Sequence, residues 1–253
     1  MNNQKILNKN LNIYPSKVEA GNAAGIAIEK KITELQEIQE EVRIIFAAAP
    51  SQNETLEYLT KSKLIDWSKI NAFNMDEYLG LPPDSNQLFS NYLNEKLFSK
   101  VKIGAINVIN TLGDVIEEMD SYKNKLMEKD IDIVCLGIGE NGHIAFNDPP
   151  VADFKDSQVI KIVKLDELCR QQQVNDECFE TIGKVPKEAV TLTIPALMKG
   201  RYIYCIVTGS NKANAVKCTL SGPIDECCPA SVLRTHPHCK FYLDNAAVSK
   251  TDL

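Results

Sequence analysis

Two acids and one histidine in this sequence could move a proton. Asp76 and Glu77 come directly after the apolar run 69–75, and burial there would raise the pKa of a carboxylate towards neutrality, as a general base requires. His143 lies in the stretch 136–150, LGIGENGHIAFNDPP, where an imidazole could exchange a proton near neutral pH. Each has a plainer alternative: Asp76 could cap a turn, and a single loop histidine is often only a surface residue.

The residues around His143 favour a ligand site over a surface loop. Asn141 precedes it by two positions and Asp148 follows it by five. Gly137, Gly139 and Gly142 indicate positive φ angles or a close approach of the backbone to a ligand. Several polar groups therefore converge on the end of one predicted strand.

Two further stretches could bind an anion. APSQNE (49–54) and TGSNKA (208–213) each lead into a predicted helix, and helix N-termini offer free N–H groups. We expect Ser51 to cap the first helix, with Glu54 completing a capping box. Lys212 would be unfavourable in the first turn of the second helix unless an anion is bound there. Capping alone explains either stretch, but two such stretches in one crevice favour a phosphate.

The elements that position these residues follow a βαβ pattern, in which short β-branched runs alternate with helical periodicity. Strands are expected within 42–49, 69–75, 106–110, 131–139, 202–209 and 239–244, the last closing the sheet. Residues 158–165 could form an edge or antiparallel strand. Helices are expected within 17–41, 51–64, 87–98, 114–129 and 210–222. The pattern predicts one α/β domain over 1–253, with a doubly wound, mostly parallel sheet and helices on both faces. Ligands bind such sheets at the carboxyl ends of the strands, where all the residues above lie.

Composition excludes several classes of protein. The chain has 253 residues, 44% of them apolar, and a net charge of −6. No basic stripe offsets this charge, so we expect no nucleic-acid partner. No apolar run approaches the roughly 18 residues of a membrane span, and the polar start has no signal-peptide segment, so we expect a cytoplasmic protein. A small anionic ligand remains compatible with this charge.

The cysteines are expected to pack as small apolar side chains. There are eight, scattered along the chain, and the expected compartment disfavours disulfides. The tail 227–239, CCPASVLRTHPHC, gathers cysteines and histidines and invites a zinc interpretation. It lacks the paired C-x2-C spacing of structural zinc sites, so we expect no metal.

The motifs FNMDEYLGLP (73–82) and LGIGENGHIAFNDP (136–149) closely resemble the glucosamine-6-phosphate deaminase/isomerase family. The resemblance continues through LTIPALMKG (192–200) and VTGSNKA (207–213). It implies a Rossmann-like fold and conversion of an amino-sugar phosphate to fructose 6-phosphate and ammonia. It also implies a sugar-phosphate substrate, no metal or organic cofactor, and a chain that is a monomer or a homo-oligomer.

By the same resemblance, Asp76 would transfer a proton between C2 and C1 of the opened sugar, and His143 would open the ring. Asn141 and Asp148 would support the histidine. The residues that would bind the substrate and its phosphate are Ala48, Ala49, Ser51, Gln52, Gly137, Gly139, Arg170 and Lys212.

Three positions depart from the family pattern. Asn141 replaces an Asp and cannot stabilise an imidazolium by charge. Asp148 replaces a Glu, so we expect its carboxylate to withdraw from the histidine by about 1.5 Å unless the backbone follows. Pro50 removes one N–H donor from the phosphate loop. These changes leave open which hexosamine phosphate is used and whether ammonia is released.

Two other functions remain open. A 6-phosphogluconolactonase shares the fold and a Gly-x-Gly-His loop, but IAFNDPP follows His143 here in place of the lactonases' Thr-Ala-Ser-Leu-Phe pattern. The other is a sugar-phosphate sensor without turnover, which Asn141 and Asp148 would explain.

Overall fold

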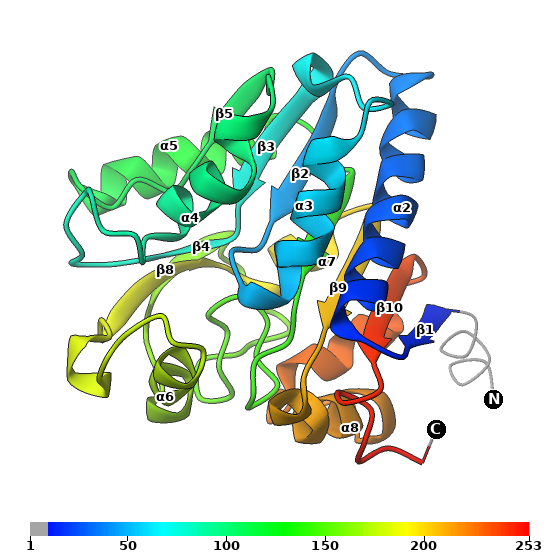
Figure 1. The fold of residues 1–253 in the computed structure, drawn as a ribbon. Coiled ribbons are helices and arrows are strands. Elements are labelled where there is room, and N and C mark those ends of the chain that lie inside the picture. Colours follow the sequence, from blue (N-terminus) through cyan, green and yellow to red (C-terminus); the bar gives the residue numbers. More distant parts are fainter. Residues whose placement is uncertain (1–9, 253) are drawn as a thin grey trace.

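The computed structural model describes residues 10–252, which form a large parallel sheet and a small antiparallel one (Figure 1). Every pairing in the large sheet is parallel. In spatial order its strands are β1 (Leu11–Tyr14), β10 (Cys239–Asp244), β9 (Tyr202–Val207), β6 (Ile133–Leu136), β2 (Val42–Phe46), β3 (Ile70–Asn74) and β5 (Ala105–Asn107).

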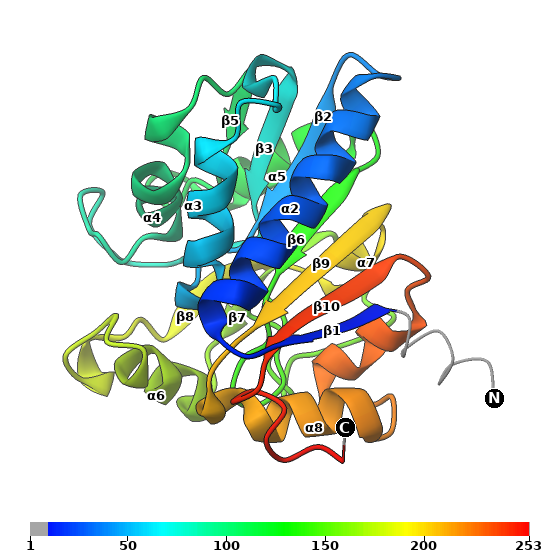
Figure 2. The ribbon, with the colours of Figure 1, turned by 45° about the vertical axis from the view of Figure 1, so that its right-hand side comes forward.

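Helices cover both faces of this sheet because its strands are apolar on both sides (Figure 2). Alternate side chains of a strand point to opposite faces, so Ile44 of β2 packs in one core and Ile45 in the other. The Ile44 core is covered by α2 (Lys17–Gln36), α3 (Asn53–Lys61) and α4 (Phe89–Lys96). The opposite core is covered by α5 (Val115–Met127), α7 (Ile194–Met198) and α8 (Ala213–Ser221).

The small sheet lies beside the carboxyl ends of the large one. It pairs β4 (Asp76–Tyr78), β8 (Glu188–Leu192) and β7 (Ile160–Lys164) in antiparallel fashion. A third apolar cluster joins it to α6 (Glu167–Asn175). Short 3-10 helices complete the fold: η1 (Pro50–Gln52), η2 (Trp67–Lys69), η3 (Phe98–Lys100), η4 (Ile182–Lys184), η5 (Ser210–Lys212) and η6 (Pro229–Thr235).

The doubly wound parallel sheet predicted from the sequence is confirmed, as is an antiparallel strand within 158–165. The position of β10 was predicted wrongly. It lies inside the sheet, because β1 pairs with it and forms the edge. The sequence analysis missed β1, which has only four residues.

The capping box at Ser51 and Glu54 is a second wrong prediction. Helix α3 begins at Asn53 with no side-chain cap, because Ser51 lies in η1 and Glu54 pairs with Lys17 at 3.0 Å. A side-chain N-cap forms instead at Ser16, before α2: its hydroxyl accepts the Glu19 N–H at 3.2 Å and donates to the Glu19 carboxylate at 2.9 Å.

Candidate active site

A cavity of about 420 Å³ lies where loops leave the carboxyl ends of β2, β3, β6 and β9. This volume suits a small ligand of hexose-phosphate size. Eight of the residues predicted from the sequence line it: Ala48, Ala49, Ser51, Asp76, Gly137, Gly139, His143 and Lys212. Gln52, Asn141, Asp148 and Arg170 do not line it.

Asp76 and Glu77 have separate roles at the start of β4. Asp76 lines the cavity and is 7% exposed, while Glu77 is buried against the start of α4. Burial, with a smaller contribution from Glu77, raises the pKa of Asp76 well above its usual range. Glu77 accepts N–H groups of Phe89 and Ser90, each at 2.8 Å, and of Tyr78 at 3.0 Å. Asp76 is thus the carboxylate available to a ligand.

His143 is held from one side of its ring by two oxygens. Its Nδ1 lies 2.8 Å from Asn141 Oδ1 and 2.8 Å from Asp148 Oδ1. The Asn141 amide also donates to Asp148 Oδ1 at 2.9 Å, which orients its own oxygen towards the imidazole. Both neighbours of Nδ1 are therefore acceptors, so Nδ1 carries the proton and Nε2 keeps a free lone pair.

The withdrawal expected of Asp148 does not occur. The side chain is 1% exposed and its oxygen is in full hydrogen-bond contact with His143. A turn supports it, in which the N–H groups of Val151 and Ala152 donate to the Asp148 carbonyl. Burial alone would raise the pKa of Asp148, but the bond to His143 and the one from Asn141 lower it below its usual range. Asp148 thus supplies the negative charge that Asn141 lacks.

Glycine is required where His143 lies against the loop. A Cβ built on Gly139 would stand 2.1 Å from Cε1 and 2.2 Å from Nε2 of the imidazole. The same loop approaches the β2 loop at Gly137, whose Cβ would lie 3.2 Å from the Ser51 hydroxyl. Both glycines therefore let neighbouring groups approach the cavity wall, as the sequence analysis expected of this loop.

Two of the side chains predicted to bind the phosphate, Ser51 and Lys212, line the cavity. Gln52 lies behind the wall, and its amide donates to Ser51 Oγ at 3.1 Å and to the carbonyls of Leu136 and Ile206. Lys212 is buried, which lowers its pKa, although Asp176 and Glu140 act in the opposite direction. A buried ammonium and a hydroxyl that line one cavity suit an anion.

Arg170 is the predicted site residue that the structure places elsewhere. Its guanidinium donates to the carbonyls of Ile182 at 2.5 Å and Val185 at 3.0 Å, on η4 and the residue after it. The direction of the Arg170 side chain depends on the rotation of α6 about its own axis against the small sheet. Spacing along the sequence does not reveal that rotation.

Several lining residues were missed by sequence reasoning. Lys17, the first residue of α2, reaches the cavity, as do Gln172, Gln173 and Asp176 at the end of α6. The SKVE capping signal at 16–19 could have located Lys17 at a strand-to-helix turn. No local signal indicated the α6 residues. Within residues 10–252, Lys17 and Lys212 are the only basic side chains besides His143 in the lining.

The cysteine- and histidine-rich tail is used for packing in the described chain. His236 Nε2 is hydrogen-bonded to the Gly200 carbonyl at 2.8 Å, and Cys239 is buried in β10. The metal-ligand types that do gather within residues 10–252 are His143, Asp148 and Cys169, whose ligand atoms lie within 4.8 Å of one another.

A family model described as glucosamine-6-phosphate isomerases/6-phosphogluconolactonase matches residues 15–241. The chain belongs to this family. Among curated members, glucosamine-6-phosphate deaminase of Listeria innocua is 37% identical over 223 residues, which cover 88% of this chain and 91% of the relative. That of Streptococcus equi subsp. zooepidemicus is 34% identical over 189 residues, covering 74% and 79%.

Solved structures in the family share the fold. A monomeric glucosamine-6-phosphate deaminase superposes with a TM-score of 0.85 at 29% identity, covering 94% of this chain and 98% of the other. The 6-phosphogluconolactonase of Thermotoga maritima gives a TM-score of 0.75 at 22% identity, covering 93% and 100%, which reports the common fold alone. The family resemblance read from the motifs is confirmed. No helix within residues 10–252 is both long and apolar enough to cross a membrane.

Proposed function

We propose that this protein converts an amino-sugar 6-phosphate, glucosamine 6-phosphate or its galactosamine epimer, to the ketose 6-phosphate and ammonia. The observation that carries the proposal is that Asp76 and His143, 67 positions apart, line one cavity that also contains Ser51 and Lys212. The names of the curated relatives support the same reaction.

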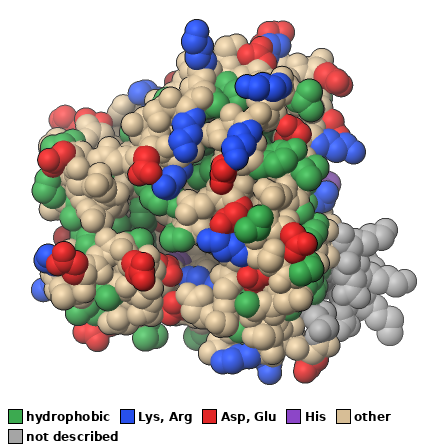
Figure 3. Space-filling view, in the orientation of Figure 1, with side chains coloured by type: hydrophobic (Ala, Val, Ile, Leu, Met, Phe, Trp, Pro, Cys, Tyr) green, Lys and Arg blue, Asp and Glu red, His purple; other side chains and the backbone are tan. Residues whose placement is uncertain are grey.

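The substrate phosphate would bind between Ser51 and Lys212. The hydroxyl can donate to a phosphate oxygen, and the buried ammonium gains a partner whose charge opposes its desolvation. Lys17 extends the positive charge at the rim, where its pairing with Glu54 leaves it 46% exposed. Acidic and basic side chains are interspersed over the outer face that bears α2 and α3 (Figure 3). The positive charge that would attract a phosphate is therefore confined to the two lysines of the cavity lining.

His143 would open the sugar ring. With its proton on Nδ1, the imidazole accepts the anomeric hydroxyl proton at Nε2 and returns it to the ring oxygen as the C1–O5 bond breaks. The imidazolium formed in between is stabilised by Asp148, 2.8 Å from Nδ1.

Asp76 would then transfer a proton from C2 to C1 of the open-chain sugar. As a carboxylate it removes the C2 proton and delivers it to C1, while O1 gains a proton and the amino nitrogen loses one, so that the 2-amino aldose becomes the C2 imine of the ketose. Water adds to the C2=N bond and ammonia leaves. The raised pKa of Asp76 suits this role, because the group must both accept and return a proton near neutral pH.

The test is to incubate the purified protein with glucosamine 6-phosphate and galactosamine 6-phosphate separately, and to measure ammonium and ketose 6-phosphate together. We expect equimolar products from at least one epimer. Ketose without ammonium would contradict the deamination step. Acid release from 6-phosphogluconolactone, with no product from either amino sugar, would indicate a lactonase. Sugar-phosphate binding with no product over hours would indicate a sensor.

A further inference from the structure

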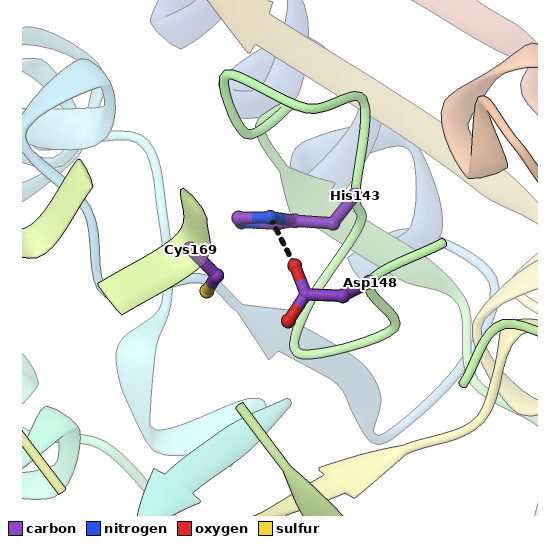
Figure 4. A group of neighbouring side chains, drawn as sticks. All are labelled: His143, Asp148 and Cys169. Atoms are coloured by element: carbon purple, nitrogen blue, oxygen red, sulfur yellow. Dashed lines mark ion pairs between the residues drawn. The ribbon is translucent and has the colours of Figure 1, made fainter. Parts of the chain in front are cut away.

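A buried histidine, carboxylate and thiol converge behind the cavity wall (Figure 4). His143 and Asp148 come from the loop after β6, and Cys169 comes from α6. The imidazole Nδ1 and the Asp148 Oδ1 are 2.8 Å apart, and the Cys169 sulfur lies within 4.8 Å of one ring nitrogen of His143 and one carboxylate oxygen of Asp148. The thiol is 1% exposed and has no part in the reaction proposed above.

Asp148 has one oxygen without a hydrogen bond of good geometry. Oδ1 contacts His143 and Asn141, while Oδ2 is fully buried, and the Asp166 N–H and the Cys169 thiol approach the carboxylate. An ionised carboxylate with an unpaired buried oxygen is costly, and such atoms are usually satisfied by a hydrogen bond or an ion. This oxygen belongs to the carboxylate that already contacts His143, within reach of Cys169.

The donor set matches a borderline-soft divalent ion. Zinc binds imidazole nitrogen, thiolate sulfur and carboxylate oxygen at about 2.0–2.3 Å, and one ligand atom of each kind lies within 4.8 Å of the others here. A neutral imidazole, one carboxylate and one thiolate would balance the two positive charges, so the buried complex would be neutral. Asn141 Oδ1, also 2.8 Å from Nδ1, would supply a fourth donor.

We propose that His143, Asp148 and Cys169 form a binding site for a zinc-like divalent cation, and that the bound ion inhibits the enzyme. Binding releases the Cys169 thiol proton to solvent and moves the imidazole proton from Nδ1 to Nε2, since the ion takes the Nδ1 lone pair. His143 then cannot accept the anomeric proton. The inhibitory half of this proposal depends on the proposed function, whereas metal binding does not.

Binding is tested by titrating Co²⁺ into the full-length protein under reducing, anaerobic conditions. We expect one equivalent to bind, with a thiolate-to-cobalt charge-transfer band and the strong visible bands of a four-coordinate ion. Cys169→Ser should abolish the charge-transfer band, whereas Cys227→Ser, at an exposed thiol outside the cluster, should keep it. Cys169→Ala serves if the serine variant does not fold. Asp148→Asn should weaken binding by more than the roughly 10–100-fold typical of losing an outer-shell partner.

A charge-transfer band that persists in both Cys169 variants, or is lost in Cys227→Ser, would assign the ion to other thiols and overturn the proposal. Absence of any band would do the same. Inhibition by Zn²⁺ is then measured on each active variant relative to its own uninhibited rate, and we expect at least a tenfold higher inhibitory concentration for Cys169→Ser. Because the cobalt titration requires no turnover, absence of deaminase activity would contradict the proposed function and leave the metal site standing.

Discussion

Asp76 and Glu77 are adjacent buried carboxylates that face different surroundings. Asp76 opens into the cavity, whereas Glu77 accepts three backbone N–H groups, two of them from the first turn of α4. The alternation of side chains along β4 separates them, because neighbouring residues of a strand point to opposite sides. One carboxylate is therefore free for chemistry, and the other stabilises the helix that borders the site.

Asp76→Asn should abolish the reaction with little effect on ligand binding. The amide keeps the size of the side chain but cannot accept the C2 proton, so we expect kcat to fall by about 10²–10⁴-fold. Calorimetric binding of glucosamine 6-phosphate should change by less than about threefold, because the phosphate contacts are untouched. Asp84→Asn, at an exposed acid, is the matched control. Normal turnover by Asp76→Asn would show that another group moves the proton.

The free energy of unfolding should depend on pH through the ionisation of Asp76. Its folded-state pKa is raised above the usual 3.8, so its contribution to the free energy of unfolding is fully present below that value and is lost as pH rises through the raised pKa. The Asp76→Asn variant cannot ionise at this position, so it does not lose this stability as pH rises. We therefore expect the Tm of the variant minus the Tm of the wild type, measured by calorimetry, to increase as pH rises from about 4. A difference independent of pH would mean that the carboxyl is not desolvated in the folded protein.

Asp148→Asn should slow the reaction because it impairs proton transfer by His143. An asparagine removes the charge that stabilises the imidazolium and can present an N–H to Nδ1, which favours the wrong tautomer. We expect kcat/KM to fall by about a hundredfold or more, with the loss in kcat and little change in KM. Steady-state kinetics over a pH series measures both. Wild-type kcat would show that Asn141 suffices to orient the histidine.

Gly139→Ala should displace the imidazole. The added Cβ would lie 2.1 Å from the ring, so His143 must move by about 1 Å or more, and misplacement on that scale costs about a hundredfold in rate. Gly113→Ala is the matched control, because its nearest neighbour would be 3.7 Å away. The comparison of kcat for the two variants is the measurement, and equal activities would contradict the close contact at Gly139.

Lys212→Gln should weaken substrate binding through its phosphate. Loss of one charged hydrogen bond costs about 1.5–3 kcal/mol, so we expect KM to rise by about 10–100-fold. Inhibition by inorganic phosphate should weaken in parallel. A loss confined to kcat, with phosphate inhibition unchanged, would place the phosphate away from this lysine.

The pattern of apolar runs predicts most of the large sheet, though not its edge strand β1, and it predicts the loops that carry the chemistry. Continuous apolar runs separated by helical periodicity predict buried parallel strands, and parallel strands bring their carboxyl ends to one edge. That rule predicts that Asp76, His143, Ser51 and Lys212 lie at one edge of the sheet, and the four residues line one cavity. Gly139 was equally predictable, since it makes room for His143 four positions along the same loop, whereas Gly137 makes room for Ser51 of the distant β2 loop.

Only the tertiary structure decided which distant side chains complete the site. Lys17 reaches the cavity because β1 adds to the edge of the sheet, and Gln173 because α6 packs on the small sheet. The same packing directs Arg170 to η4 and brings Cys169 behind His143. Spacing along a chain fixes the strand end or turn on which a residue lies, but the rotation of a helix against its neighbours depends on apolar contacts between segments far apart in the sequence.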